Sequence, residues 1–440
     1  MRRLPLRFPH LLLLASVLLV PSSASATNGH VLHGNGSVSE SMGGASIATS
    51  LDAIGSVTSN VSSASFLDQS SIEFAAEVFV PDRTLGGSVS GQASGTVKSA
   101  AREAVIPAFG LAYKSTSPWT FSFTAVGVGG FGVDYPGNQP NPSGQFNPLA
   151  APQSAGGFGS IYSNYQLLQV TPSIAYQLTP TLSVGVGLDA DWASLAVNPW
   201  PATPPDASGY PTGSHAATSW GFGVTAGATF KLLPSLALGA SVKSPQWFDT
   251  FSWNSEFPDG APTRFRFGLD YPLIAGIGAS FTPVDPLTLA LDLKWIDYAD
   301  TKGFERQGFA ASPTGPYVRG FGWRSIYTAS LGAQYRLTPS LAIRAGYNYG
   351  GNPILSSQQF FNVFAPAIVQ HHLSGGLGIA LTDRIGLDVA YYHAFRAEET
   401  GPFVSAGAPS YPPANAAIPG TEVKNTLSED SVSAQVAVRF

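Results

Sequence analysis

Side chains that could carry out catalysis or bind a metal are few in this 440-residue chain, and their spacing is poor. The two histidines of His30–His33 lie in a Gly- and Ser-rich N-terminal stretch that we expect to be mobile, and His371-His372 is not flanked by carboxylates at ligand spacing. The pair Asp189 and Asp191 lacks the Gly and Glu of a calcium loop, and the sequence contains no Gly-x-Ser-x-Gly nucleophile elbow. We therefore expect no catalytic residue, no metal and no cofactor, and a protein that is not an enzyme.

Aromatic side chains offer a different chemistry, the binding of an apolar molecule. Six of them gather in and beside the stretches 198–215 and 248–263, namely Trp200, Trp247, Phe248, Phe251, Trp253 and Phe257. So many aromatics in polar stretches indicate an exposed surface that captures a hydrophobic ligand, and we expect these residues to bind it. Packing of the two stretches against each other would use the same residues, and the sequence leaves both readings open.

The elements that position these aromatics can be recognised from a repeated turn. YQLTPTL at 176–182 returns as YRLTPSL at 335–341, and looser versions lie between and after them. Around each turn, apolar residues alternate with small or polar ones for about ten positions, which is the pattern of two strands joined by a tight turn. The repeat therefore predicts a series of β-hairpins.

Alternation and turn residues together predict an all-β fold of about fourteen strands. We place these strands near 71–82, 105–114, 118–133, 159–178, 181–197, 216–232, 235–247, 264–283, 286–300, 322–338, 340–350, 370–382, 384–396 and 425–440. Tight turns join some pairs, and long loops, among them 83–104, 134–158 and 301–321, join the others. Short turns on one side and long loops on the other are typical of a transmembrane antiparallel β-barrel. A soluble β-sandwich would show the same alternation and is the less favoured alternative.

Composition supports a barrel that faces lipid. Charged residues make up 11% of the chain, whereas about 25% is usual in soluble proteins. Lys and Arg number 22 and Asp and Glu 27, a net charge of −5 that argues against a nucleic-acid partner. The chain has no Cys, so disulfides cannot contribute to its stability.

The two ends of the chain indicate where it goes. Arg2, Arg3 and Arg7 precede the apolar run 11–20, and Ala24-Ser25-Ala26 fits a signal-peptidase site, so residues 1–26 are expected to be a signal peptide. A membrane anchor is disfavoured for the run 11–20, because it has ten residues and a membrane-spanning helix needs roughly 20 apolar residues. The last strand ends in Phe440, which resembles the signal read by the barrel assembly machinery. We expect residues 71–440 to form a barrel in the outer membrane of a Gram-negative type of envelope, in contact with its lipid.

Residues 27–70 differ from the rest because they contain no strand of useful length. They are small, polar and Gly-Ser-rich, with isolated apolar residues, which predicts compact irregular structure or a short helix at 46–54. We expect this segment to be a hatch, or plug, inside the barrel lumen, and a flexible periplasmic tail is the alternative. Its gate residues are expected to be Met42, Gly43, Gly44 and Asn60.

Several stretches resemble the FadL family (the OMPP1/FadL/TodX type), outer-membrane transporters of long-chain fatty acids and related hydrocarbons. These stretches are GNGSVSESMGGASIATSLDA (34–53), IEFAAEVFVPD (72–82), FTAVGVGGFGV (123–133), LTLALDLKWIDYAD (287–300) and GWRSIYTASLGAQYRLTPSLAIRAGYNYGGNPI (322–354). The resemblance implies a fourteen-stranded barrel closed by an N-terminal hatch, and an external ligand groove formed by long loops. This chain has Asn60-Val61-Ser62 where the family usually has Asn-Pro-Ala, so we expect a hatch that is looser or differently gated.

The resemblance also implies that the third strand is kinked and opens the wall sideways to the membrane. That strand carries Gly127, Gly129, Gly130 and Gly132, and glycines inside a strand mark bulges or bends. We therefore expect passive uptake of long-chain fatty acids or related hydrophobic compounds, by loop capture, hatch gating and lateral release. A nonspecific porin or structural barrel is the first alternative, and an outer-membrane lipid hydrolase is a weaker one.

Overall fold

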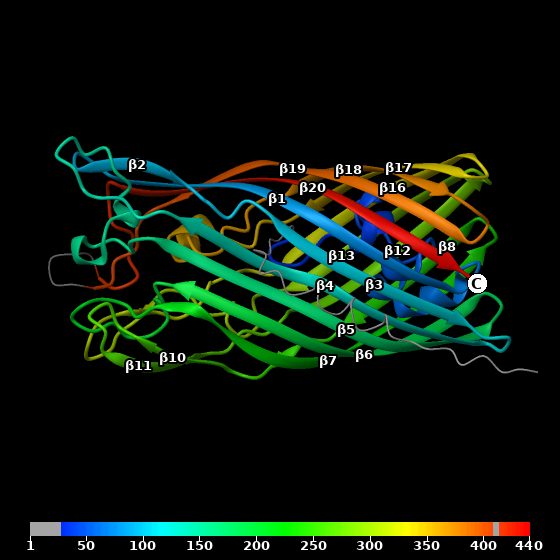
Figure 1. The fold of residues 1–440 in the computed structure, drawn as a ribbon, viewed down its shortest axis with the longest axis horizontal. Helices are drawn as coiled ribbons and strands as arrows, with labels where there is room; N and C mark the ends of the chain where they lie inside the picture. Colours follow the sequence, from blue (N-terminus) through cyan, green and yellow to red (C-terminus); the bar gives the residue numbers. More distant parts are fainter. Residues whose placement is uncertain (1–27, 408–412) are drawn as a thin grey trace, which may run out of the picture.

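The molecule is a closed antiparallel β-barrel whose strands are steeply tilted (Figure 1). A computed structural model describes residues 28–407 and 413–440, so the expected signal peptide at 1–26 lies outside the described residues. The main sheet contains 16 strands, and β2 (Ala93–Lys98) and β9 (Trp247–Phe248) are short additions to it. Fourteen strands therefore form the wall, and the predicted all-β barrel of about fourteen strands is confirmed.

The wall strands follow one another around the barrel in the order of the chain. They are β1 (Ser71–Val89), β3 (Ala104–Lys114), β4 (Trp119–Tyr135), β5 (Ile161–Thr179), β6 (Leu182–Asn198), β7 (Gly213–Leu233), β8 (Leu236–Lys243), β12 (Leu273–Val284), β13 (Leu287–Asp297), β16 (Ile326–Thr338), β17 (Leu341–Gly350), β18 (His371–Ala380), β19 (Ile385–Gly401) and β20 (Thr421–Arg439). The barrel closes between β1 and β20, which pair from Ser71–Arg439 to Val89–Thr421. Closure gives the backbone groups of both terminal strands a partner, which a water-free layer requires.

Alternation along the strands separates a lipid-facing surface from a polar interior. In β13, Leu289, Leu291 and Leu293 are exposed on the outside, whereas Asp292 between them is 1% exposed. The short turns lie at one end of the barrel and the long loops at the other, as Figure 1 shows. The repeated turn therefore sets the short-turn end, which is the periplasmic end in such barrels.

The long-loop end contains more strand than the sequence predicts. The predicted loop 83–104 is wrong, because β1 continues to Val89 and turns back into β2, and the predicted loop 248–263 holds the hairpin of β10 (Phe251–Glu256) and β11 (Pro262–Phe267). The predicted single strand 264–283 is divided into β11 and β12 by residues 268–272. At the long-loop end, β1 and β2 form one hairpin and β10 and β11 form another, in stretches where loops were expected. The other long loops hold η2 (Pro148–Ala150), η3 (Gln153–Ala155), β14 (Phe309–Ala310), β15 (Tyr317–Val318) and η4 (Ser356–Asn362).

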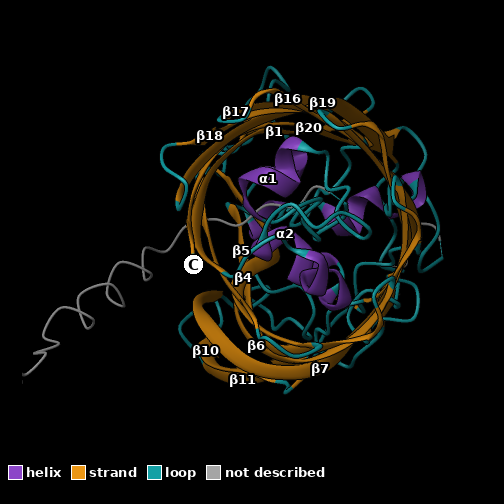
Figure 2. Cartoon of the chain, turned by 90° about the vertical axis from the view of Figure 1, so that its right-hand side faces the viewer, coloured by secondary structure: helices purple, strands orange, loops and turns teal. Residues whose placement is uncertain are grey.

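The N-terminal segment lies inside the barrel, as the view along the barrel axis shows (Figure 2). It contains α1 (Gly36–Ser41), α2 (Ala53–Ser59) and the 3-10 helix η1 (Val61–Phe66). Of the two forms expected at 46–54, the helix is wrong and residues 46–52 are irregular, because the N–H groups of Ser46 and Ile47 bind a carboxylate of the wall and α2 begins only after its N-cap Asp52. Among residues 28–407 and 413–440, no helix is both long and apolar enough to cross a membrane.

Candidate functional site

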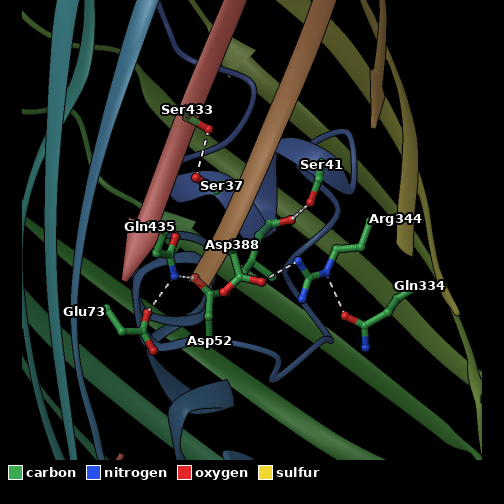
Figure 3. A network of polar contacts seen from close by, with 10 residues as sticks. Ser37, Ser41, Asp52, Glu73, Gln334, Arg344, Asp388, Ser433 and Gln435 are labelled. Atoms are coloured by element: carbon green, nitrogen blue, oxygen red, sulfur yellow. Dashed lines mark hydrogen bonds and ion pairs between the residues drawn. The ribbon is translucent and has the colours of Figure 1, made fainter. Parts of the chain in front are cut away.

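The helical part of the hatch, residues 36–66, is seated on carboxylates of the wall. The Glu73 carboxylate on β1 accepts the N–H groups of Ala53 at 2.9 Å and Ile54 at 3.1 Å, at the N-terminus of α2. The Gln435 amide on β20 donates to both Asp52 and Glu73 at 3.1 Å, as Figure 3 shows. Hydrogen bonds to a charged acceptor are among the stronger ones, so this contact fixes α2 to the wall.

A second carboxylate holds the backbone between the two helices. Asp292 on β13 accepts the N–H groups of Ser46 at 2.7 Å and Ile47 at 2.9 Å. Arg344 on β17 and Asp388 on β19 form a buried ion pair of 2.7 Å in the interior (Figure 3). Asp292 therefore anchors the hatch by accepting hydrogen bonds from its backbone, a role that its inward-facing position in an alternating strand did not reveal.

Burial changes the acidity of the carboxylates on the hatch itself. Burial, reinforced by the negative charge of Glu73, raises the pKa of Asp52 to about 7. Burial and the charge of Glu77 likewise raise the pKa of Glu40 well above its usual range. The helical part of the hatch therefore binds protons more tightly when it is docked than when it is exposed to water.

Asn60 lies at the centre of the hatch, between α2 and η1. Its amide nitrogen donates to the Ile47 carbonyl at 2.8 Å and to the Thr229 hydroxyl at 3.1 Å. Its oxygen accepts the N–H and the hydroxyl of Ser62 at 3.2 and 2.7 Å, and Ser62 also meets Thr229 at 2.8 Å. Ser62 thus makes polar contacts that the Ala of an Asn-Pro-Ala sequence could not make. The expected gating role of Asn60 stays a prediction.

Met42, Gly43 and Gly44 form a tight turn against the wall. Gly43 and Gly44 adopt positive φ angles of 65° and 81°. A Cβ atom on Gly43 would lie 2.7 Å from the backbone of Tyr347, and one on Gly44 would lie 1.9 Å from the carbonyl oxygen of His33. Met42 is 1% exposed. These three residues are placed together, with little room for substitution, and their gating role stays a prediction.

Residues 28–35, which we call the strap, run along the glycine-rich part of β4. The ladder between β3 and β4 ends at the Ala108–Val126 pair, and β4 has a bulge between Gly127 and Gly129. From there the strap joins β4: Leu32 N–H donates to Val128 at 3.2 Å, Gly130 N–H to His30 at 3.0 Å, and the Asn35 amide to Gly127 at 2.8 Å.

Gly129 allows this close approach, because a Cβ atom there would lie 2.2 Å from the His30 carbonyl oxygen. A Cβ atom on Gly127 would meet the side chain of Ile106 on β3 at 2.7 Å. Gly132 lies further along the same strand, opposite Asn164 of β5. The four glycines expected at the lateral opening are therefore on one irregular stretch of β4, and their role stays a prediction.

The expectation that His30 and His33 lie in a mobile segment is wrong, because both are buried, with 0% and 2% exposure. Five aromatic rings surround the His30 imidazole, and we call them the cage: Tyr165, Tyr271, Tyr298, Phe304 and Trp323. The imidazole stacks on Phe304 with ring centres 4.8 Å apart and 18° between planes, and meets the edge of Tyr271 at 5.3 Å. The strap therefore ends in an apolar enclosure.

Polar contacts of His30 are confined to its backbone. The Tyr298 hydroxyl accepts its N–H at 3.1 Å and donates to the Asn28 carbonyl at 2.7 Å. Both ring nitrogens of His30 are buried without a hydrogen-bond partner among the described residues. Burial lowers the pKa of this imidazole to about 3, so the ring is neutral at neutral pH.

The six aromatics expected to capture ligand are mostly not exposed. Trp200, Phe248, Phe251 and Trp253 are at most 6% exposed, Phe257 is partly buried, and only Trp247 is largely exposed. Trp200, Trp253 and Phe265 stack on one another with ring centres 4.7 to 5.3 Å apart, which ties loop 198–215 to the β10–β11 hairpin. The expected exposed aromatic surface is therefore wrong in this arrangement, and the ligand-binding role of these residues stays a prediction.

A large groove lies at the long-loop end, and a small cavity lies along the strap. A groove of about 650 Å³ lies beside the β10–β11 hairpin and is lined by polar residues, among them His215, Asn254 and Arg264. The cavity between the strap, β4 and β13 is only about 60 Å³, little more than one or two water molecules require. Little free volume therefore remains in this cavity beside the strap.

Within the described ranges, no group of three or more His, Asp or Glu side chains could hold a metal ion. His371 instead meets the Tyr347 hydroxyl at 2.6 Å, and His393 meets Asp430 at 2.9 Å. These histidines are thus engaged in pairwise contacts.

Sequence reasoning missed the cage. Its members come from β5, from the residue stretches before β12 and β16, and from the stretch after β13. Tyr298 is the exception, because it belongs to the LTLALDLKWIDYAD stretch and could have been noticed as an aromatic just beyond a strand. The other members follow no local spacing, so only the fold brings them together.

Comparisons with known proteins agree with this architecture. The family model described as outer membrane protein transport protein (OMPP1/FadL/TodX) matches residues 18–401. No curated protein matches the sequence.

Solved structures of similar fold include the P. putida toluene transporter TodX (17% identity, TM-score 0.69, covering 93% of this chain and 99% of that one). Another is the Ralstonia pickettii toluene transporter TbuX (19% identity, TM-score 0.65, covering 93% of this chain and 99% of that one). A third is a Pseudomonas aeruginosa FadL homologue (14% identity, TM-score 0.70, covering 94% of this chain and 100% of that one). At these identities the structures show the fold alone. The family model spans most of the chain, which therefore belongs to the OMPP1/FadL/TodX family, a family of outer-membrane transport channels and not of enzymes.

Proposed function

We propose that this channel takes up hydrophobic compounds, a class that includes long-chain fatty acids and hydrocarbons, by passive diffusion through a gate made by the strap. The single observation that carries the proposal is that β4 pairs with β3 up to Val126 and with the strap beyond it. Where the β3–β4 ladder ends, the strap supplies the hydrogen bonds to Val128 and Gly130. Movement of the strap would free this stretch of the wall and the lumen beside it at the same time.

The strap can move without disturbing the rest of the hatch. Its hydrogen bonds to β4 join neutral groups, from the backbone and from the Asn35 amide, whereas the helical part of the hatch is bound to Glu73 and Asp292. A compound that passes the displaced strap would meet the bulge at Gly127–Gly129 and leave sideways into lipid. An apolar molecule that takes this route avoids the aqueous periplasmic end, so transfer between apolar surroundings needs no energy source.

Capture is assigned to the long-loop end. The groove beside the β10–β11 hairpin adjoins the stacked Trp200, Trp253 and Phe265, so a small opening between these rings would expose apolar surface to the outside. Trp247, already largely exposed, and Phe257 lie on the same loop.

Uptake in a deletion strain tests the proposal. The strain is complemented with the wild-type chain, and entry of labelled oleate and labelled toluene is measured together with arabinose permeation and esterase activity. We expect uptake of at least one apolar compound to depend on the chain, with no change in arabinose entry. Unchanged entry of every apolar compound would refute the proposal, arabinose flux would support the porin alternative, and esterase activity would support the hydrolase.

Gly129→Val tests the lateral route in the same strain. The side chain would collide with the His30 carbonyl and distort the strap on β4. We expect uptake to fall while barrel assembly, checked by heat-dependent migration in detergent gels, is retained. Full uptake by an assembled variant would mean that compounds leave by another path.

A further inference from the structure

The seam where β1 meets β20 faces a column of buried carboxyl groups. Two of them, Glu73 and Glu77, belong to β1, and two, Glu40 of α1 and the N-cap residue Asp52 of α2, belong to the hatch. All four are at most 7% exposed. One end of the column is visible in Figure 3, where the Gln435 amide lies between Asp52 and Glu73. The hatch and the wall therefore meet through groups that would repel each other if all were charged.

The strand β20 offers this column only neutral donors. Three of its inward-facing side chains, at alternate positions, donate hydrogen bonds to the four carboxyl groups: Ser431 to Glu77 at 2.6 Å, Ser433 to Glu40, and Gln435 to both Asp52 and Glu73 at 3.1 Å. Within the described parts of the chain, none of the four carboxyl groups forms an ion pair with a Lys, Arg or His side chain. The column thus lacks a counter-charge.

Other titratable and charged groups near the column do not supply one. Asp388 is already held by Arg344. Burial lowers the pKa of His33 well below its usual range, so its ring is neutral at neutral pH. The remaining neighbours are a carboxylate with an arginine beside it, a lysine beside the carboxylate of β13, a tyrosine and a second imidazole: Glu429, Arg83, Lys294, Tyr392 and His372.

The column therefore needs protons. Glu40 and Glu77 are hydrogen-bonded to each other, and two carboxylates cannot form such a bond unless one of them carries a proton to donate. The raised pKa values of Glu40 and Asp52 place the protons on the hatch. Each hatch carboxyl is then neutral while it faces a carboxyl group of β1.

Rising pH removes these protons and turns the contact into a repulsion. Both pKa values lie above the ordinary range, so the contribution to docking is complete below about pH 4 and is lost as the pH rises through the raised values. Because each contact has one member on the hatch and one on β1, the repulsion acts between these two parts.

The surface that such a repulsion uncovers is acidic. Glu73, Glu77 and Glu429 all lie on inward-facing, buried positions of β1 and β20, and Arg83 lies beside Glu429. A row of carboxylates attracts cations and repels anions, as in the acidic rings of cation channels.

We propose that the hatch is a proton-locked gate, in which protonated Glu40 and Asp52 hold it against β1 and β20, and alkaline medium opens a water-filled path along this seam that conducts small cations. This activity is separate from the uptake of hydrophobic compounds, and it does not require the strap to leave β4.

Conductance of the full-length protein in planar bilayers with KCl on both sides tests the proposal. We compare pH 6.5, where the strap histidines are neutral, with pH 9. The conductance should be about tenfold larger at pH 9, since one unit of pKa shift corresponds to a tenfold change in an equilibrium. It should return to its first value at pH 6.5, and the reversal potential in a KCl gradient should show a preference for K⁺. Equal conductance at both pH values, or a preference for Cl⁻, would overturn the proposal.

Neutral variants of the hatch carboxyls separate the lock from the fold. In Glu40→Gln the amide can still donate to Glu77 and accept from Ser433, and Asp52→Asn keeps a side chain that caps α2 well. Neither side chain has a proton to lose, so the double variant should keep the low conductance at pH 9. The control Asp82→Asn changes an exposed carboxyl on β1 that pairs with Lys98, and it should open like the wild type.

Migration in detergent gels shows which variants form a folded barrel. A double variant that is folded and still gains full conductance at pH 9 would overturn the proposal. Equally high conductance at both pH values would do the same, because neutral side chains of the same shape should hold the hatch in place.

Discussion

The strap and the helical part of the hatch lie side by side in one lumen, but different interactions hold them. The helical part places its backbone N–H groups on the carboxylates Glu73 and Asp292. The strap relies on neutral hydrogen bonds to β4, from its backbone and from the Asn35 amide, on one tyrosine hydroxyl and on aromatic contacts around His30. A hydrogen bond to a charged group contributes about 1.5–3 kcal/mol, against about 0.5–1.5 kcal/mol for a neutral one. The comparison teaches that one half of the plug is anchored and the other half can be released.

The largest effect is expected when the anchor itself is removed. Glu73→Ala leaves two buried N–H groups of α2 without their acceptor and removes one of the two acceptors of the Gln435 amide. We expect the docked hatch to lose about 3 kcal/mol, and ion conductance in planar bilayers to rise. Asp82→Ala on the same strand is the matched control, because its carboxylate is exposed and pairs with Lys98 at the surface. Equal conductance in the two variants would show that Glu73 is not an anchor.

A smaller effect, confined to the strap, is expected from Tyr298→Phe. The variant keeps the ring of the cage but removes the hydroxyl that binds His30 and Asn28. We expect a cost of about 1–2 kcal/mol, seen as roughly tenfold faster amide hydrogen exchange at His30 and Gly130, while amides of α1 and α2 keep their rates. In the control Tyr271→Phe, the hydroxyl that is lost makes only a long contact of 3.4 Å. Faster exchange throughout the hatch would mean that the two halves do not move independently.

The two halves should respond to pH with opposite signs. The raised pKa of Asp52, which faces Glu73 and Asp388, means that the docked helices bind more protons, so their stability falls as pH rises from about 4 to about 7. The lowered pKa of His30 means that the seated strap binds fewer protons, so its stability falls as pH drops below 6.5 towards about 3.

Hydrogen exchange at pH 5 and pH 8, corrected for the intrinsic rate, measures both trends. Each titrating group is expected to contribute at most about 1.4 kcal/mol per pH unit. Asp52→Asn should reduce the response of the helices and leave the part due to Glu40, and His30→Ala should reduce the response of the strap and leave the part due to His33, whose pKa burial also lowers. If the stability of both halves changed with pH in the same direction, the idea that the strap and the helical part are held independently would be contradicted.

The smallest effects are expected at the turn that departs from Asn-Pro-Ala. Val61 is the first residue of η1, a position that accepts proline, so Val61→Pro should stabilise the hatch by about 0.5–1 kcal/mol. Ser62→Ala removes the hydroxyl contacts with Asn60 and Thr229 and should cost about 1 kcal/mol. The double variant should therefore lie close to the wild type in urea unfolding of the hatch, and a large loss would show that the serine has a role that the proline cannot replace.

Periodicity along the sequence predicted the wall because a lipid-facing strand must alternate over its whole length. It failed at 83–104 and 248–263, where polar sequence at the long-loop end forms the β1–β2 and β10–β11 hairpins. The ion pair of Arg344 and Asp388 could be inferred from charges on inward-facing positions. The cage could not, because His30 meets Tyr298 and Trp323 only through contacts that cross more than half of the chain.

The same limit explains the misjudged aromatics of the loops. Aromatic residues in a polar stretch look exposed when the stretch is considered alone, but Trp200 finds Trp253 and Phe265 on another loop. Local sequence reports the character of a segment and not what covers it. The strap was misjudged for that reason as well, since its Gly- and Ser-rich sequence gives no sign of the β4 edge that orders it.

The seam between the first and last strands has a consequence for how long the barrel survives. Gln435 of β20 reaches Asp52 of the hatch and Glu73 of β1, and Ser433 of β20 binds Ser37 and Glu40. The docked hatch therefore clamps the two strands that would have to separate first if the barrel unzipped. Escape from the native state requires expulsion of the plug before the seam can part, so the plug that closes the channel also gives the barrel its kinetic stability.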